Sequence, residues 1–263
     1  MIKFKNCEII CGDCREKVKE LIENGVKVDL TVTSPPYDDL RNYQEKNSFT
    51  EETWRNLIPL LYEITNDGGV VVWIVNDRTK NGSKTGTSFK QALAFMEAGF
   101  NLNDTMIWEK TNPMPQVAQP RYNQSFEYMF VFSKGKPKTF NPIKVPCKCA
   151  GQDYDSTCKN MGGENGRTEK HFIINKYKVK SNVWKFAVAN NKTIHPAVFP
   201  LQLAIDHILS WTNEGDMVLD PFVGSGTSGI AALRLNRNFI GIDIVPEYCK
   251  LTEEQILNEI TDK

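Results

Sequence analysis

Four consecutive residues, Ser34-Pro35-Pro36-Tyr37, combine groups that could bind and orient an amino group. They follow a run of strand-forming residues, Val28–Thr33. Proline has a fixed φ and no N–H, so the Pro-Pro pair ends that strand and leaves a rigid carbonyl unpaired. The Ser34 oxygen and the Pro35 carbonyl can each accept a hydrogen bond from an NH₂ group, and Tyr37 can stack on a flat ring. The stretch therefore predicts a site that orients the exocyclic amino group of a base, mainly by positioning.

A second stretch, Asp220–Gly229 (DPFVGSGTSG), has the features of a loop that binds a nucleotide-type cofactor. It follows the predicted strand Met217–Leu219 and opens the predicted helix Ser228–Leu235. Glycines at 224, 226 and 229 have the G-x-G-x-x-G spacing that allows a tight turn and close backbone approach to a ligand. Asp243 ends the next predicted strand, where its carboxylate can accept hydrogen bonds from ribose hydroxyls. The alternative is a glycine-rich turn that serves only helix–strand packing.

Two cofactors compete for this loop. NAD places its pyrophosphate on a helix N-terminus, and the carboxylate of Asp220 would repel that group. S-adenosylmethionine (SAM) has no phosphate and carries a sulfonium and an ammonium, which a negative charge favours. We therefore expect SAM as the cofactor and keep an NAD dehydrogenase as a distant alternative.

The elements around these stretches alternate between strands and helices. Strands are predicted at Cys7–Cys11, Val28–Thr33, 70–75, Met106–Trp108, Glu127–Phe132, Met217–Leu219 and Phe239–Ile242. Helices are predicted at Arg15–Glu23, Thr50–Ile64, Phe89–Ala98, Pro200–Trp211, Ser228–Leu235 and Glu247–Ile260, and a Gly68-Gly69 break is expected before 70–75. This alternation predicts an α/β sheet with helices on both faces, and both candidate loops fall at its carboxyl edge, where such sheets bind ligands.

Charge is distributed unevenly along a chain whose formal net charge is zero. Residues 131–192 hold thirteen basic and four acidic residues, a net charge of +9, and the rest of the chain carries −9. From Lys134 to about Asn191 the hydrophobic periodicity fades and glycine, asparagine and lysine dominate. We interpret this part as a loop-rich insertion that contacts a polyanion, with a solvated lysine-rich loop as the alternative.

The two motifs together resemble those of the amino-methylating DNA methyltransferases. TSPPY is similar to the catalytic motif of that family, and DPFVGSGT is similar to its SAM-binding motif. Their order, catalytic motif first, resembles the circularly permuted beta group. The resemblance implies a Rossmann-like SAM-dependent methyltransferase fold with a mixed, mostly parallel sheet. It divides the chain into a catalytic half (1–140), a target recognition insertion (141–192) and a SAM-binding half (193–263).

The resemblance also assigns roles to individual residues. The catalytic residues are Ser34, Pro35, Pro36 and Tyr37, and they act on a base flipped out of double-stranded DNA. The residues expected to bind the cofactor are Asp13, Thr33, His195, Pro196, Phe199, Asp220, Pro221, Phe222, Gly224, Gly226, Thr227 and Asp243. Those expected to contact DNA are Arg41, Lys144, Lys148, Lys176 and Lys178. Serine at the first motif position favours cytosine N4 as the target, and adenine N6 is the alternative.

The sequence is compatible with other functions to different degrees. Methylation of cytosine C5 needs a nucleophilic cysteine, and no Pro-Cys pair stands at a strand end of the core, since Pro146-Cys147 lies in the insertion. RNA or protein as the methylated substrate, and a module that binds nucleotide or DNA without catalysis, stay open. Cys147, Cys149, Cys158 and His171 lack the usual C-x₂-C spacing, so no metal is expected.

The remaining expectations concern surroundings and partners. The start of the chain lacks the apolar stretch of a signal peptide, and the longest apolar run, Val70–Val75, is too short to span a bilayer, so we expect a cytoplasmic protein. A cognate restriction endonuclease and a homodimer are the further partners that this class of protein suggests.

Overall fold

The computed structural model describes residues 2–4, 6–36, 49–113, 120–159, 167–188 and 199–261. Tyr37, Arg41, His195 and Pro196 from the predicted sites lie outside these ranges. The described residues divide into two compact units, 1–141 with 182–263 and Pro142–Ser181. No helix in the described ranges is both long and apolar enough to cross a membrane.

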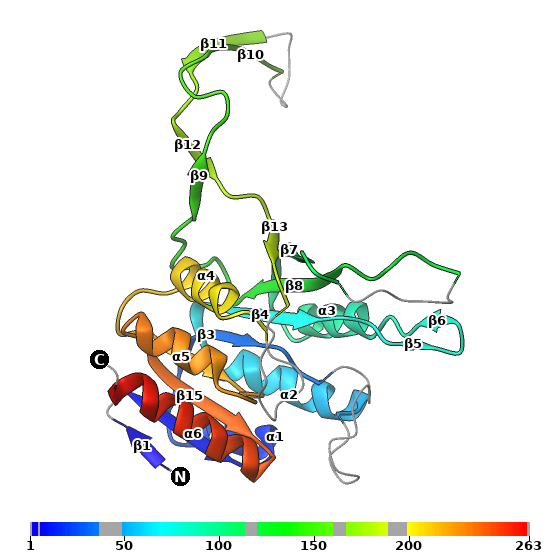
Figure 1. Cartoon of the computed structure of the whole chain (residues 1–263), viewed down its shortest axis with the longest axis vertical. Coiled ribbons are helices and arrows are strands. Elements are labelled where there is room, and N and C mark those ends of the chain that lie inside the picture. The colour runs from blue at the N-terminus through cyan, green and yellow to red at the C-terminus, as the bar shows by residue number, and fades with distance from the viewer. Residues whose placement is uncertain are drawn as a thin grey trace. The chain divides into compact units, whose positions relative to one another are not determined.

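The larger unit is built on one mixed sheet, which the described residues form in the order β1-β2-β15-β14-β3-β4-β8-β7-β13 (Figure 1). The five strands β2, β15, β14, β3 and β4 run parallel, whereas β8 is antiparallel to both of its neighbours. The bounds of the sheet's strands are β1 (Ile2–Phe4), β2 (Cys7–Cys11), β3 (Val28–Thr33), β4 (Thr65–Val75), β7 (Asn101–Lys110), β8 (Phe126–Ser133), β13 (Val183–Phe186), β14 (Met217–Asp220) and β15 (Asn238–Asp243).

Helices cover both faces of this sheet, which confirms the predicted α/β class (Figure 1). One face carries α1 (Cys14–Glu23), α2 (Glu51–Ile64) and α3 (Thr87–Glu97), and α1 and α3 each contact α2. The other face carries α4 (Leu201–Trp211), α5 (Thr227–Arg234) and α6 (Pro246–Thr261), and α4 and α6 each contact α5. The predicted helices are therefore confirmed, with ends that shift by one or two residues.

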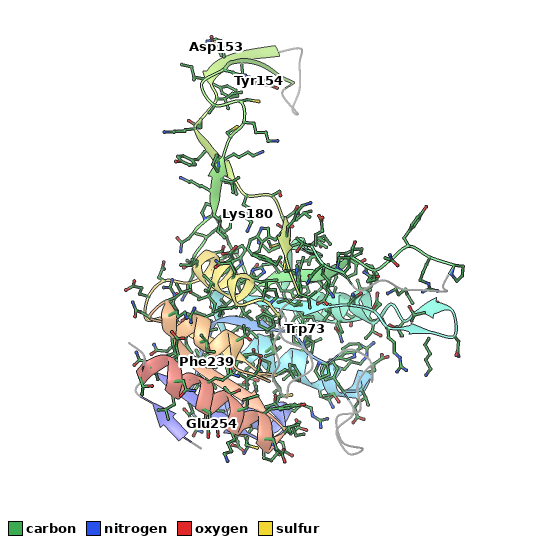
Figure 2. All side chains as sticks on the ribbon, in the orientation of Figure 1. Trp73, Asp153, Tyr154, Lys180, Phe239 and Glu254 are labelled. Atoms are coloured by element: carbon green, nitrogen blue, oxygen red, sulfur yellow. The ribbon has the colours of Figure 1, made fainter. Side chains whose placement is uncertain are left out.

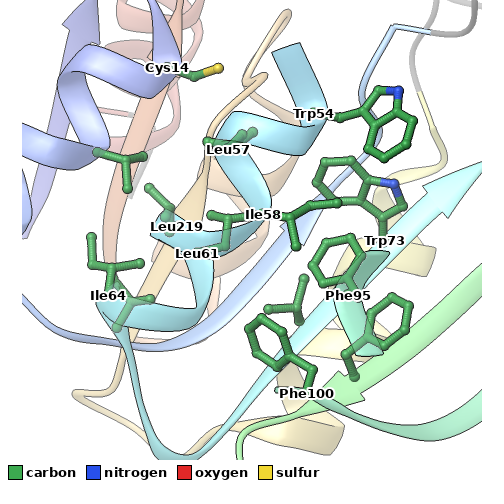
Figure 3. Packing of buried hydrophobic residues seen from close by; sticks show 14 of the residues in the cluster. Cys14, Trp54, Leu57, Ile58, Leu61, Ile64, Trp73, Phe95, Phe100 and Leu219 are labelled. Atoms are coloured by element: carbon green, nitrogen blue, oxygen red, sulfur yellow. The ribbon is translucent and has the colours of Figure 1, made fainter. Parts of the chain in front are cut away.

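Helix α2 shows why these residues form this layer. Trp54, Leu57, Ile58 and Leu61 recur at helical spacing, and each is 0–1% exposed. The hydroxyl of Thr50 caps the helix by accepting a hydrogen bond from the Thr53 N–H. Figure 3 shows these side chains packed with Trp73, Phe95 and Leu219 from neighbouring elements. Each fully buried large side chain contributes about 1.5–3 kcal/mol, so this layer holds α2 against the sheet.

The structure corrects the predicted start of the strand that follows α2. Strand β4 begins at Thr65 and continues through Gly68-Gly69, where a break was expected. At Gly68 φ is +76°, and an added Cβ would lie 2.9 Å from the Cβ of Lys138. The two glycines thus allow close approach of the chain after β8 without ending the strand. The short strands β1 and β13 were also not predicted, because three or four residues show too little periodicity.

The smaller unit, Pro142–Ser181, consists of two antiparallel ribbons. Strand β9 (Lys144–Pro146) pairs with β12 (Tyr177–Val179), and β10 (Asp153–Lys159) pairs with β11 (Arg167–Ile173). The unit lies within the predicted insertion 141–192, whose later residues Val183–Phe186 form β13 of the main sheet. We refer to Pro142–Ser181 below as the ribbon unit.

Candidate active site

The two candidate loops meet where the sheet connections diverge. After β14 the chain passes through α5 to β15, and after β3 it passes through α2 to β4, on the opposite face and in the opposite direction. Strands β14 and β3 are hydrogen-bonded neighbours, with Leu219 opposite Thr31. A parallel sheet binds ligands beyond the carboxyl ends of its strands at such a point. Ser34 and Pro221 follow these two strand ends directly.

A buried carboxylate connects the two loops. Asp220 is 1% exposed, and its Oδ1 accepts a 2.6 Å hydrogen bond from the Thr33 hydroxyl, 187 residues away in the sequence. The same oxygen accepts from the Phe222 N–H at 3.0 Å, and Oδ2 accepts from the Ser228 hydroxyl at 2.5 Å. Thr33 immediately precedes Ser34. Asp220 therefore fixes the strand end that carries the Ser-Pro-Pro motif against the glycine loop.

Burial dominates the electrostatics of this carboxyl. It raises the pKa of Asp220 to about 6, even though the hydrogen bonds from Ser228, Thr33 and Phe222 act in the opposite direction. The negative charge of Asp243 also contributes to the increase. The structure thus shows Asp220 holding the loop, and direct contact with a cofactor stays a prediction.

The glycine loop is shaped by close contacts on both sides. Gly224 and Gly226 have φ of +53° and +84°, which is unfavourable for residues with a side chain. A Cβ at Gly226 would lie 2.9 Å from the Cγ2 of Thr252, and one at Gly229 would lie 2.8 Å from the ring of Phe239. Gly229 therefore serves helix–strand packing, whereas Gly224 and Gly226 shape the turn itself.

The acidic residue at the end of β15 fits a ribose-binding role. Asp243 Oδ2 accepts from the Gly224 N–H at 3.0 Å, and Oδ1 accepts from the Val245 N–H at 2.9 Å. Burial raises the pKa of this carboxyl. A carboxylate offers about four acceptor positions, so these bonds leave capacity for a ribose hydroxyl. The donors and acidic groups present therefore fit SAM, and the acids at neighbouring strand ends oppose a pyrophosphate.

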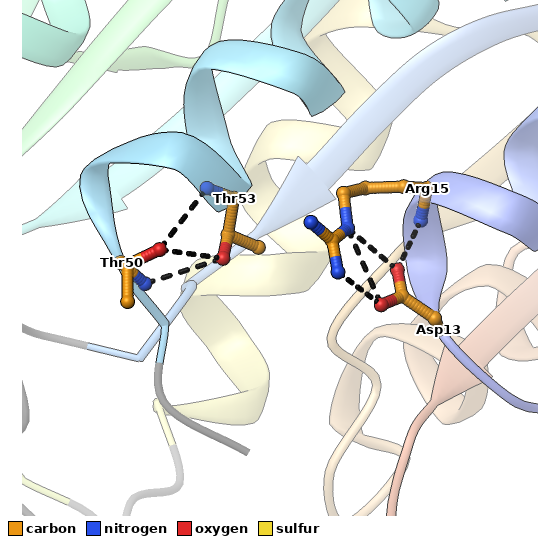
Figure 4. A network of polar contacts seen from close by, with 4 residues as sticks. All are labelled: Asp13, Arg15, Thr50 and Thr53. Carbon is orange, nitrogen blue, oxygen red and sulfur yellow. Dashed lines mark hydrogen bonds and ion pairs between the residues drawn. The ribbon is translucent and has the colours of Figure 1, made fainter. Parts of the chain in front are cut away.

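Asp13 stands at the next strand end and caps α1. Its Oδ1 accepts from the Arg15 N–H at 2.8 Å, and the Arg15 guanidinium lies 2.6 Å from Oδ2 (Figure 4). That side-chain hydrogen bond lowers the pKa of Asp13. Strand β2 pairs with β15, and the Gly12 N–H donates to the Asp243 carbonyl at 2.9 Å. Asp13 and Asp243 are thus placed at the carboxyl ends of two adjacent strands.

The other predicted site residues of the larger unit gather around the same edge. Ser34 and Pro36 are half-buried and Pro35 is buried. The Phe222 ring packs against Phe49 and Trp73, with ring centroids 5.3 Å and 6.1 Å apart. Pro221 is buried, and Thr227 is the buried first residue of α5. Phe199 is half-buried and lies just before α4, which contacts β3.

Four of the five residues predicted to contact DNA are lysines of the ribbon unit, and the fifth, Arg41, lies outside the described residues. Lys144, Lys148, Lys176 and Lys178 are all exposed. Cys147 and Cys149 are free thiols in or beside the turn after β9. Among the described residues, no group of three or more His, Cys, Asp or Glu side chains is arranged to hold a metal.

Several residues of the site were not found from the sequence. Ser228 donates to Asp220, Thr252 Oγ1 donates to the Gly224 carbonyl at 2.8 Å, and Arg15 pairs with Asp13. Ser228 lies inside the glycine motif, so its position in the sequence could have indicated a role in this site. Thr252 follows the loop by 28 residues and comes into contact only through packing of α6, which no local pattern reports.

Comparison with known proteins agrees with this geometry. A family model described as DNA methylase, covering amino methylation at N6 or N4, matches residues 28–254. The orphan methyltransferase M.BamHII of Bacillus amyloliquefaciens is 48% identical over 89% of this chain and 90% of its own length. The Type II methyltransferase M.HpaI of Haemophilus parainfluenzae is 30% identical over 95% of this chain and 74% of its own length.

Solved structures show the same fold. The M1.HpyAVI–SAM complex is 27% identical with a TM-score of 0.61, and the match covers 95% of this chain and 99% of that one. PvuII DNA methyltransferase, described as cytosine-N4-specific, has a TM-score of 0.67 over 98% of this chain and 93% of its own, at 18% identity. The predicted SAM-dependent methyltransferase fold is therefore confirmed. The chain belongs to the DNA methylase family that methylates the amino groups of bases.

Proposed function

We propose that this protein transfers a methyl group from SAM to the exocyclic amino group of a base in duplex DNA, with cytosine N4 as the target. The observation that carries the proposal is the Thr33–Asp220 hydrogen bond, because it fixes the Ser-Pro-Pro motif beside the glycine loop. SAM, the methyl donor of the family, supplies an electrophilic methyl group when bound. The catalytic assignment of Ser34, Pro35, Pro36 and Tyr37 is part of this proposal.

The residues of the chain act by orientation. An amino group conjugated with a ring is a weak nucleophile, because its lone pair is delocalised. The Ser34 oxygen and the Pro35 carbonyl accept hydrogen bonds from that NH₂ group and hold its nitrogen towards tetrahedral geometry, so that the lone pair is less delocalised into the ring and is aimed at the methyl donor. Pro36 keeps the carbonyl of Pro35 free of any turn or ladder. Tyr37 stacks on the flipped base.

The cofactor residues hold the other reactant. Asp243 accepts hydrogen bonds from the ribose hydroxyls, and the turn at Gly224 and Gly226 allows the backbone to approach the cofactor closely. Asp13, Phe199, Pro221, Phe222 and Thr227 complete the proposed pocket from neighbouring strand ends, together with His195 and Pro196, which lie outside the described residues. Asp220 contributes its negative charge and holds the wall of the pocket in place.

Target recognition is assigned to the ribbon unit. A two-stranded ribbon fits the major groove of B-DNA, and the four exposed lysines suit phosphate contacts. Tyr154 and Phe172 pair across β10 and β11 with ring centroids 5.3 Å apart, and both are about half exposed. Figure 2 shows Tyr154 on this ribbon. Exposed aromatic rings among lysines favour nucleic acid as the partner.

Analysis of the reaction product tests the proposal. The purified protein is incubated with SAM and unmethylated duplex DNA, and the DNA is then digested to nucleosides. N4-methylcytosine is the expected product. N6-methyladenine would keep the enzyme class and replace the base, whereas no methylated nucleoside would contradict the function. Competition by RNA against duplex DNA separates an RNA methyltransferase from a DNA methyltransferase.

Three statements about its surroundings belong to the same proposal. We place the protein in the cytoplasm with its DNA substrate. A homodimer is supported by Phe89, Leu93 and Met96, which form one exposed apolar stripe on α3, and light scattering of the purified protein tests it. A cognate restriction endonuclease would cleave unmethylated DNA at the same site, and cleavage that this protein blocks would identify one.

A further inference from the structure

A second basic surface lies in the larger unit, outside the predicted DNA contacts. The hairpin formed by β5 (Thr79–Lys80) and β6 (Ser83–Lys84) follows the carboxyl end of β4. Asn81 and Gly82 connect its strands with φ of +50° and +78°, which is the Asn-Gly type I′ turn that a tight hairpin prefers. The hairpin is therefore a defined element that projects from the sheet edge carrying the active site.

Cations gather on this hairpin from two parts of the chain. Arg78, Lys80 and Lys84 come from the hairpin segment. Arg121 reaches it from the loop before β8, donating to the Thr79 hydroxyl at 3.0 Å and to the Gly82 carbonyl at 2.6 Å. The Lys84 ammonium donates to the Asp77 carbonyl at 3.0 Å. Hydrogen bonds to neutral groups thus hold the positive charges together.

Within the hairpin segment, as far as the structure describes it, little negative charge offsets Lys80 and Lys84. Asp77 is the one acidic residue in the sequence from Asn76 to Thr87. It is buried, and its two oxygens accept from the N–H and the hydroxyl of Ser88 at 2.9 Å, so it fixes the start of α3. Burial lowers the pKa of Lys84, and the charge of Arg121 adds to that effect while Asp77 opposes it. Such an arrangement costs free energy until an anion binds.

The position of the hairpin points to the anion. In the sheet Thr33 lies opposite Trp73, so β4 extends past Ser34 before the hairpin begins. The hairpin begins at Thr79, shortly after β4 ends at Val75, so it follows the same carboxyl end of the sheet that Ser34 follows. Beside Arg121, the side chain of Tyr122 is 99% exposed, so it has no packing role within the described residues.

We propose that the β5–β6 hairpin with Arg121 binds the phosphate backbone of duplex DNA next to the flipped nucleotide. This inference rests on the proposed function, because it assumes a DNA substrate at the Ser-Pro-Pro site. Backbone contacts of this kind position the duplex and carry no sequence information. The larger unit thereby has its own contacts with DNA, in addition to those of the ribbon unit.

The salt dependence of DNA binding tests the hairpin directly. Binding of the full chain to a short duplex of arbitrary sequence is measured by fluorescence anisotropy between about 50 and 200 mM salt. The slope of log K against log salt is negative, and each lost phosphate contact makes it shallower by about 0.9. Lys80→Gln should therefore make the slope shallower by about 0.9, and the double variant Lys80→Gln, Lys84→Gln should make it shallower by about 1.8. Lys80→Arg keeps the charge and should keep the wild-type slope.

A matched control uses a lysine at the opposite edge of the sheet. Lys136 is exposed and follows β8 near Gly68, at the amino end of β4, so Lys136→Gln should leave the slope unchanged. A double hairpin variant with the wild-type slope would overturn the inference alone, provided that wild type binds DNA and transfers methyl groups. A wild-type protein that shows no salt-dependent binding to DNA would overturn the proposed function itself.

Discussion

The edge of the main sheet and the ribbon unit are built in opposite ways. At the edge, Asp220, Asp243 and the glycine loop are buried or half-buried, and their polar atoms bond one another across long sequence separations. In the ribbon unit, Tyr154, Phe172, Ile173, Tyr177 and Val179 are 47–65% exposed. Chemistry requires reacting groups held in fixed positions, whereas recognition requires side chains available to a partner. The two regions should therefore respond differently to the same kinds of substitution.

The largest expected effect is on catalysis at the sheet edge. Ser34→Ala combined with Tyr37→Ala removes one acceptor and the proposed stacking platform, and should lower the single-turnover methyl-transfer rate about 10²–10³-fold. SAM affinity, measured by calorimetry, should stay near the wild-type value. Ser210→Ala is a control, because this buried hydroxyl of α4 donates to the Asp206 carbonyl, away from the site. Full activity in the double variant would show that the catalytic motif is wrongly assigned.

A pH effect on stability should separate the two regions next. The folded-state pKa of Asp220 is raised from 3.8 to about 6, so the native state keeps a proton that the unfolded chain loses. The free energy of unfolding should therefore fall by about 2 kcal/mol between pH 4 and 6 through this group. Denaturant unfolding of wild type and Asp220→Asn across this range measures the fall, because the variant lacks the titrating carboxyl group.

The same substitution in the ribbon unit provides the comparison. Asp153 is exposed, with 74% of its side chain accessible, so Asp153→Asn makes the same chemical change at a carboxylate that the fold does not bury and serves as the matched control. Equal profiles for wild type and Asp220→Asn would show that burial of Asp220 carries no such free energy.

A smaller effect is expected from the aromatic pair of the ribbon unit. Tyr154→Ala and Phe172→Ala should each weaken duplex DNA binding about tenfold, as truncation of an aromatic side chain within an interface does. Their melting temperatures should match wild type, because both rings are about half exposed. Phe140→Ala is a control, since Phe140 is an exposed aromatic residue of the larger unit that packs on Trp211. A lower melting temperature with unchanged DNA affinity would assign the pair to structure.

The smallest effect is expected from a single lysine of the ribbon unit. Lys178→Gln should remove one phosphate contact and lower the salt slope of DNA binding by about 0.9. The loss should be equal for DNA with and without the recognition site. A loss confined to DNA that carries the site would instead mean that Lys178 reads a base.

The sequence predicted the parts of the site that depend on local patterns. Val28–Thr33 is confirmed as β3 with the same bounds, and the glycine loop lies between β14 and α5 as expected. The contacts of Thr33 with Asp220 and of Thr252 with Gly224 were not predictable, because only tertiary packing joins residues 187 and 28 positions apart. The β5–β6 hairpin was also missed, although Asn81-Gly82 was a usable turn signal.

Sequencing that detects modified bases tests the central claim most directly. DNA from cells that express the wild-type protein is compared with DNA from cells that express Ser34→Ala. We predict N4-methylcytosine in one sequence context with wild type, and its loss or strong reduction with the variant. The same methylation pattern in both samples, or methylation at cytosine C5, would contradict the account.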